Sequence, residues 1–93
     1  MVIVMMVVDF HLPGCRSLKE KRQRLSRIRD RFGKKSYLAV CESDYQDAHR
    51  QAQWSFVAVG VDRKKVEQTL AEVELFLDTG LDALISKREL HEL

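Results

Sequence analysis

Ten of the sixteen lysines and arginines of this chain lie between residues 16 and 35, together with only two acidic residues. This stretch carries a charge of +8, whereas the remaining six basic and twelve acidic residues sum to −6. Guanidinium and ammonium groups bind phosphates, and arginine does so through paired donors. The imbalance predicts an acidic partner such as nucleic acid, with a merely solvated helix face as an equal alternative.

A nucleophilic site can be drawn around Asp9, His11 and Cys15, which lie close together in the sequence. Cys15 stands beside Arg16 near the expected start of a helix, a basic environment that suits a reactive thiol. No second base accompanies it, and beyond Gly14 there is no glycine-rich loop that could hold a phosphate. We therefore predict that the protein is not an enzyme.

Metal and membrane sites are not indicated. The three histidines do not combine with Cys15 or Cys41 at a zinc-site spacing, and the two cysteines form no C-x-x-C pair. The most apolar stretch, residues 1–8, is far shorter than the roughly 20 residues that a membrane-spanning helix needs. We expect no metal, no cofactor, no membrane contact and a cytoplasmic location.

The basic stretch is expected to form an amphipathic helix. Ser17 lies three residues before Glu20, the spacing of a capping box, and Gly33 supplies a stop. Four apolar residues share one stripe of a 3.6-residue repeat: Leu18, Leu25, Ile28 and Phe32. The helical wheel places four arginines on the outer side, Arg16, Arg24, Arg27 and Arg31, and two beside the apolar stripe, Arg22 and Arg29.

Four strands and a second helix complete the prediction. The strands are expected over residues 2–10, 37–42, 54–61 and 83–90, with the polar residues 43–53 as a turn. The second helix begins after Asp62, repeats apolar residues at helical spacing and ends at Gly80. The order β-α-β-β-α-β within a single domain, residues 1–93, predicts a ferredoxin-like α+β sandwich. Its four-stranded antiparallel sheet carries two helices on one face.

The central strands have apolar residues on both faces. Alternate residues of the third strand form two rows, Trp54, Phe56 and Ala58 on one side and Val57, Val59 and Val61 on the other. A strand that is apolar on both sides needs cover on both sides. Because the chain has no spare helix, we expect a homodimer that buries the sheet face opposite the helices.

The aromatic pair Trp54 and Phe56, two residues apart on a strand, resembles the base-stacking platform of RNA-recognition domains. The basic residue and glycine that should precede such a platform are missing, and the first strand supplies no second stacking aromatic over residues 2–8. Packing in the core or in a dimer is the favoured interpretation of this pair.

Lys21 lies within the apolar stripe of the first helix. A lysine at such a position either extends its ammonium group to the surface or meets a carboxylate. Glu42, beside the core residues of the second strand, is the expected partner, so we predict a structural ion pair between Lys21 and Glu42.

Two segments have a family resemblance: Ser17-Leu18-Lys19-Glu20-Lys21-Arg22 after Pro13, and Glu42-Ser43-Asp44-Tyr45-Gln46-Asp47 before Ala52. Together with the order of elements they resemble the YlxP-like family, small bacterial proteins described as a domain of unknown function. The similarity covers nearly the whole chain. It implies a ferredoxin-like fold and a cytoplasmic bacterial protein, often encoded beside translation-initiation and ribosome-maturation factors, and it implies no established activity.

Two functions stay open on the sequence alone. One is a non-enzymatic accessory protein that binds RNA or ribosome phosphates through the first helix. The other is a homodimeric protein-interaction module whose basic face meets an acidic protein. The residues expected to contact phosphates are Lys19, Arg24, Arg27, Arg31, Lys34 and Lys35. Changing Arg24, Arg27 and Arg31 together to glutamate should then abolish binding and leave thermal stability nearly unchanged.

Overall fold

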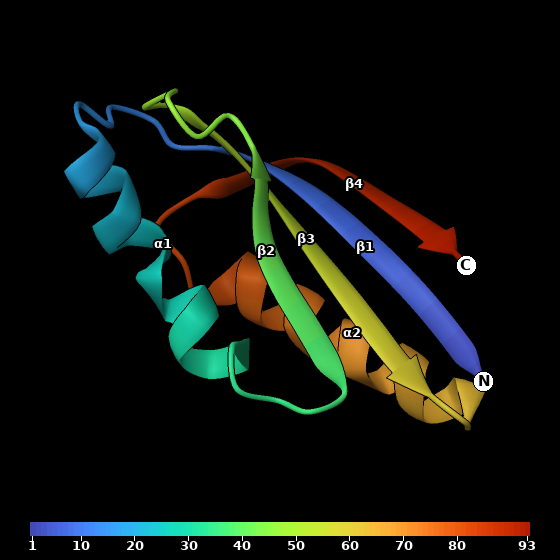
Figure 1. Ribbon diagram of the computed structural model, residues 1–93. Helices are drawn as coiled ribbons and strands as arrows, with labels where there is room; N and C mark the ends of the chain where they lie inside the picture. The colour runs from blue at the N-terminus through green and yellow to red at the C-terminus, as the bar shows by residue number, and fades with distance from the viewer.

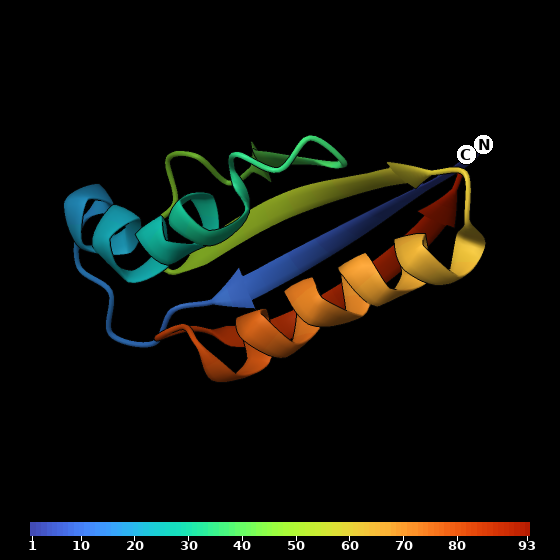
Figure 2. The same cartoon turned by 90° about the horizontal axis from the view of Figure 1, so that it is seen from below.

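A computed structural model describes all residues, 1–93, as one sheet with two helices (Figure 1). The elements are β1 Val2–His11, α1 Leu18–Phe32, β2 Leu38–Asp44, β3 Gln51–Gly60, α2 Arg63–Thr79 and β4 Leu84–Glu92. Neighbouring strands are antiparallel in the order β2-β3-β1-β4, so β1 and β3 lie at the centre. The predicted ferredoxin-like α+β fold is confirmed. Both ends of the chain lie at the same end of the sheet (Figures 1 and 2).

The second and third strands are longer at their junction than predicted. β2 continues to Asp44 and β3 already begins at Gln51, so both ends of the polar segment expected as a turn belong to strands and only residues 45–50 form the connection. Ser43 Oγ donates to Gln53 Oε1 at 2.9 Å, and Ser55 Oγ donates to Ser43 Oγ at 2.8 Å. These cross-strand hydrogen bonds satisfy polar side chains on a solvated face, which a search for apolar alternation does not detect.

The core lies between the sheet and the helices. Alternate residues of the two central strands point into it and are buried: Val4, Met6, Val8 and Phe10 of β1, and Ala52, Trp54, Phe56 and Ala58 of β3. Trp54 and Phe56 therefore pack in the core, as the favoured interpretation expected. The helices contribute Leu25, Ile28 and Phe32 from α1, and Val66, Leu70, Val73 and Leu77 from α2.

The first helix has structural neighbours on both flanks. It packs on β2, whereas α2 packs on β3, β1 and β4 (Figures 1 and 2). Phe32 and Phe76 meet edge to face between the helices, with ring centroids 5.5 Å apart. One flank of α1 therefore faces α2 and the other faces the edge strand β2. At its start, Ser17 Oγ accepts the Glu20 N–H at 3.0 Å, which is one half of the predicted capping box, while the Glu20 carboxylate accepts from Arg24.

The opposite face of the sheet carries no second layer. Its apolar residues are Ile3, Met5 and Val7 of β1 and Val57 and Val59 of β3. Ile3 pairs with Val59 and Met5 with Val57, and all of these residues are half-buried except Val59, which is 38% exposed. Both central strands thus present apolar side chains on both sides, as predicted. Neither helix has the length and apolarity that crossing a membrane requires.

Candidate functional site

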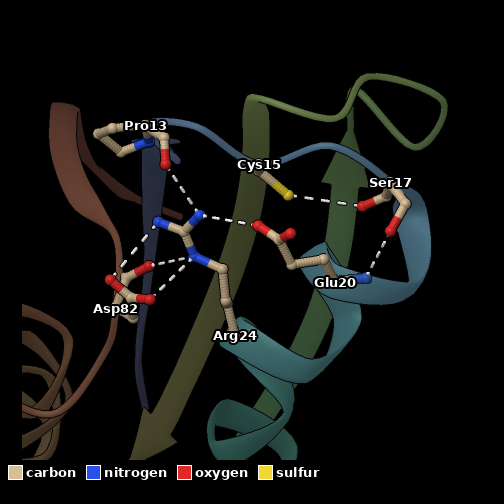
Figure 3. Close-up of polar contacts among 6 residues, drawn as sticks. All are labelled: Pro13, Cys15, Ser17, Glu20, Arg24 and Asp82. Atoms are coloured by element: carbon tan, nitrogen blue, oxygen red, sulfur yellow. Dashed lines mark hydrogen bonds and ion pairs between the residues drawn. The ribbon is translucent and has the colours of Figure 1, made fainter.

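The side chain of Arg24 is mostly buried and bonded to other parts of the chain. The prediction that it lies on the outer side of the helix is therefore wrong. Its side chain is only 13% exposed. Nη1 donates to the Pro13 carbonyl at 3.0 Å and to the Glu20 carboxylate at 3.3 Å, while Nε donates to the Asp82 carbonyl at 2.8 Å. Figure 3 shows the guanidinium enclosed by the segment before α1 and the segment before β4. Its donors hold these segments together, so Arg24 is not a free phosphate ligand.

Arg27 and Arg31 also turn toward α2. Arg27 Nη1 donates to the Gly80 carbonyl at 2.9 Å and lies 5.3 Å from the centroid of the Phe76 ring. Arg31 lies 5.2 Å from the same centroid and 3.7 Å from the Glu72 carboxylate. The carbonyls that end a helix and the face of an aromatic ring both attract cations.

The three arginines of the predicted phosphate contact thus lie on the flank of α1 that faces α2 and the segment before β4. Changing all three to glutamate would place carboxylates against Glu20, Asp82 and Glu72, which now pair with them. From these contacts we expect the triple change to lower stability, in place of the nearly unchanged stability expected from the sequence. A charged residue at the edge of an apolar stripe contacts whatever element lies beside the helix, and the wheel does not show that element.

Six other basic residues remain on the solvent side of this region. They are exposed, and none lies within 4.0 Å of a carboxylate oxygen. We call them the basic surface: Arg16, Lys19, Arg22, Arg29, Lys34 and Lys35. Lys19, Lys34 and Lys35 were among the predicted phosphate ligands. Arg22 and Arg29 were not, although the same wheel placed them beside the apolar stripe on the flank that α2 does not cover.

Lys21 is buried with its charge satisfied, and its side chain is only 4% exposed. Nζ lies 3.4 Å from Glu42 Oε2, the predicted partner. It also donates to the carbonyls of Tyr45 at 2.7 Å and Ala48 at 2.9 Å. Tyr45 has a φ of 61°, a left-handed conformation that a non-glycine residue adopts at a cost. The ammonium group thus clamps the turn after β2 onto α1.

The residues considered for nucleophilic chemistry do not converge on one site. Cys15 is buried, and its Sγ donates to the Ser17 carbonyl at 3.4 Å. Asp9 Oδ1 accepts a hydrogen bond from Gln53 Nε2 at 2.9 Å on the open face of the sheet. His11 is exposed at the end of β1. No group of three or more His, Cys, Asp or Glu side chains is arranged to hold a metal ion.

Two exposed ion pairs that involve β4 shift the pKa values of their members. The hydrogen bond from Arg63 lowers the pKa of Glu92, and the pKa of the Arg63 guanidinium is raised by the same contact. The hydrogen bond from Lys87 lowers the pKa of Glu89, and the carboxylate raises the pKa of Lys87 in return. None of these groups belongs to the basic surface.

Comparison with known proteins identifies relatives without an assigned activity. Residues 3–89 match the family model described as a protein of unknown function, DUF503. The chain is also 36% identical over 63 residues to the uncharacterized protein YlxP of Bacillus subtilis (strain 168), which covers 68% of each of the two chains.

Proposed function

The chain belongs to the DUF503 family, as the family-model match and its YlxP relative show, and from its surface charge we propose a function as a nucleic-acid accessory protein. It acts without catalysis of its own and holds RNA, free or within the ribosome, through the basic surface at α1. The single observation that carries this proposal is the set of six exposed basic side chains without a carboxylate partner.

This region carries more positive charges than are paired with carboxylates of the chain. Lys21, Arg24 and Arg31 pair with carboxylates of the protein, whereas the basic surface keeps six positive charges facing solvent. Such a concentration of charge attracts polyanions and raises their local concentration. Phosphate contacts position a nucleic acid without reading its bases, so we expect weak sequence preference.

Binding of a labelled single-stranded RNA should weaken strongly with salt, because each phosphate contact releases counterions. Three to five contacts predict a log–log slope of about −2 to −3.5, at roughly −0.7 per neutralised phosphate. Fluorescence anisotropy over a salt series measures this slope. Wild-type protein that binds no RNA at low salt would refute the proposal and leave an acidic protein as the partner of the basic surface.

Two pairs of consecutive lysines, one after α1 and one at the start of α2, offer a matched comparison for the same assay. Lys34→Glu with Lys35→Glu alters the basic surface, and Lys64→Glu with Lys65→Glu makes the same change of net charge at the exposed start of α2. We expect the first pair to reduce affinity about tenfold or more and to flatten the salt slope by about 1.4, which corresponds to two lost contacts. Equal losses from both pairs would show that only net charge matters and that α1 is not the contact surface.

The open sheet face favours a second candidate, a protein-interaction module built as a homodimer. Ile3, Met5 and Val7 lie beside Val57 and Val59 with no layer of this chain above them. A second copy offers the same apolar rows and covers both faces at once. Sedimentation at micromolar concentration should give a dimer, and Met5→Glu with Val57→Glu should give a monomer. A wild-type protein that sediments as a strict monomer rules out this interface.

A further inference from the structure

A cleft of about 530 Å³ separates α1 from β2 and the turn that follows it, on the flank away from α2. Its volume lies in the range of small-molecule sites, which is roughly 300–1,000 Å³. Leu18 and Leu25 of α1 and Trp54 of β3 supply its apolar wall. Polar groups surround that wall, among them Arg22, Arg29 and Asp47.

Trp54 lines this cleft, and its buried indole N–H is a donor without a partner in the chain. The residue is only 5% exposed, and its Nε1–H has no hydrogen-bond partner. A buried donor without an acceptor destabilises a fold, and in native proteins an ordered water, an ion or a ligand satisfies such a group. The partner of an N–H group is an acceptor atom.

Two arginines line the same cleft. Arg22 and Arg29 are seven residues apart on α1, so they lie on one face with a rise of about 10 Å between them. The Arg29 guanidinium lies 5.1 Å from the centroid of the Trp54 ring, and neither arginine pairs with a carboxylate. Both side chains are exposed and long enough to bring their donors to one group between them.

The acidic residues of the cleft limit which chemical groups a bound molecule can carry beside them. Glu42 is neutralised by Lys21, at 3.4 Å. Asp30 and Asp47 also line the cleft and have no cationic partner in the chain. Their carboxylates accept hydrogen bonds from hydroxyl or amino groups and repel a second anionic group.

We propose that this cleft binds a phosphate monoester whose organic part carries hydroxyl or amino groups. Arg22, Arg29 and the Trp54 indole N–H hold the phosphate, after the Arg29 side chain swings aside from the indole. A monoester carries a charge of about −1.5 to −2 at neutral pH, and the two guanidinium groups offer it paired donors with positive charge. The phosphate comes either from a free small molecule or from the 5′ end of an RNA, and the inference stands whether or not the lysines of the basic surface bind RNA.

Trp54 is the only tryptophan, so its single indole N–H resonance and its fluorescence report directly on this site. The probes are inorganic phosphate, adenosine monophosphate, and one RNA oligonucleotide with either a 5′-phosphate or a 5′-hydroxyl end. We expect the resonance to shift with adenosine monophosphate and to stay in place with adenosine. A shift with the 5′-phosphorylated RNA but not with its 5′-hydroxyl form identifies an RNA end as a ligand, and a shift with the mononucleotide alone identifies a free metabolite.

Variants separate this site from the general basic surface. Arg22→Gln and Arg29→Gln should each weaken adenosine monophosphate about tenfold, whereas Arg16→Gln, an exposed arginine outside the cleft, should leave it unchanged. Lys34→Glu with Lys35→Glu should weaken RNA and spare the mononucleotide. An indole resonance that no phosphate probe shifts at millimolar concentration overturns the inference, and so do equal effects of Arg16→Gln and Arg29→Gln. RNA binding by the wild-type protein could persist in either case, so the two proposals fail independently.

Discussion

Replacing Lys21 by alanine is expected to lower the free energy of unfolding by about 3 kcal/mol, because it leaves three acceptors without their common donor. The Glu42 carboxylate and the carbonyls of Tyr45 and Ala48 lie 2.7 to 3.4 Å from Nζ. The left-handed backbone of Tyr45 also loses a contact that holds it in place. For a domain of this size the midpoint of thermal unfolding should fall by roughly 12 to 24 °C.

Lys19→Ala is the matched control for this prediction. It removes the same side chain from α1 at an exposed position and should change stability by less than about 0.5 kcal/mol. Lys21→Met keeps the apolar stem and separates the packing of the stem from the role of the charge. If Lys21→Ala melts within about 2 °C of the wild type, the ammonium group does not clamp the turn as the structure indicates.

Arg24→Ala should lower the free energy of unfolding by about 2 kcal/mol, because the guanidinium joins the segment before α1 and the first turn of α1 to the segment before β4, 58 residues away. It contacts the Pro13 carbonyl before α1, Glu20 within α1, and Asp82 before β4 (Figure 3). The loss leaves the two carbonyls and the two carboxylates without these donors. Urea unfolding should show a lower midpoint with an unchanged slope, the behaviour of a change in stability alone.

Arg22→Ala tests whether the loss of stability expected for Arg24→Ala is specific to position 24. Arg22 is an arginine of the same helix but is exposed and makes no ion pair, so its removal should cost under about 0.5 kcal/mol. Arg24→Lys should recover part of the loss, since a lysine keeps the charge but cannot direct donors to Pro13 and Asp82 at once. Equal midpoints for Arg22→Ala and Arg24→Ala would contradict the tie that we describe.

For Lys21, the sequence predicted one of its contacts and missed the others. Its place within the apolar stripe, and that of Glu42 beside a buried strand, were enough to name an ion pair. The carbonyls of Tyr45 and Ala48 were not foreseeable, because backbone acceptors carry no residue signature. Their position depends on the left-handed turn that follows β2.

The basic helix shows the same limit on a larger scale. The excess of charge in residues 16–35 is a property of the sequence, and so is the stripe of Leu25, Ile28 and Phe32 that docks α1. The sequence does not show which arginines stay free of carboxylate partners. A helical wheel gives the direction of a side chain relative to the core, but not the element that lies in that direction. On one flank, α2 and the segment that follows it contact Arg24, Arg27 and Arg31, while the other flank opens on the cleft and leaves Arg22 and Arg29 without carboxylates.

By itself the sequence determined the order of the elements, the fold class, the core face of each helix and the apolar rows of the sheet. These features follow from apolar repeats of 2 and 3.6 residues. Such a repeat can be recognised within a few helical turns or a single strand. Only the tertiary structure decided the partners of Arg24, the clamp at Lys21 and the unpaired indole of Trp54. Such contacts join segments up to 58 residues apart, as Arg24 and Asp82 are, and their geometry is set only when the helices and strands pack together.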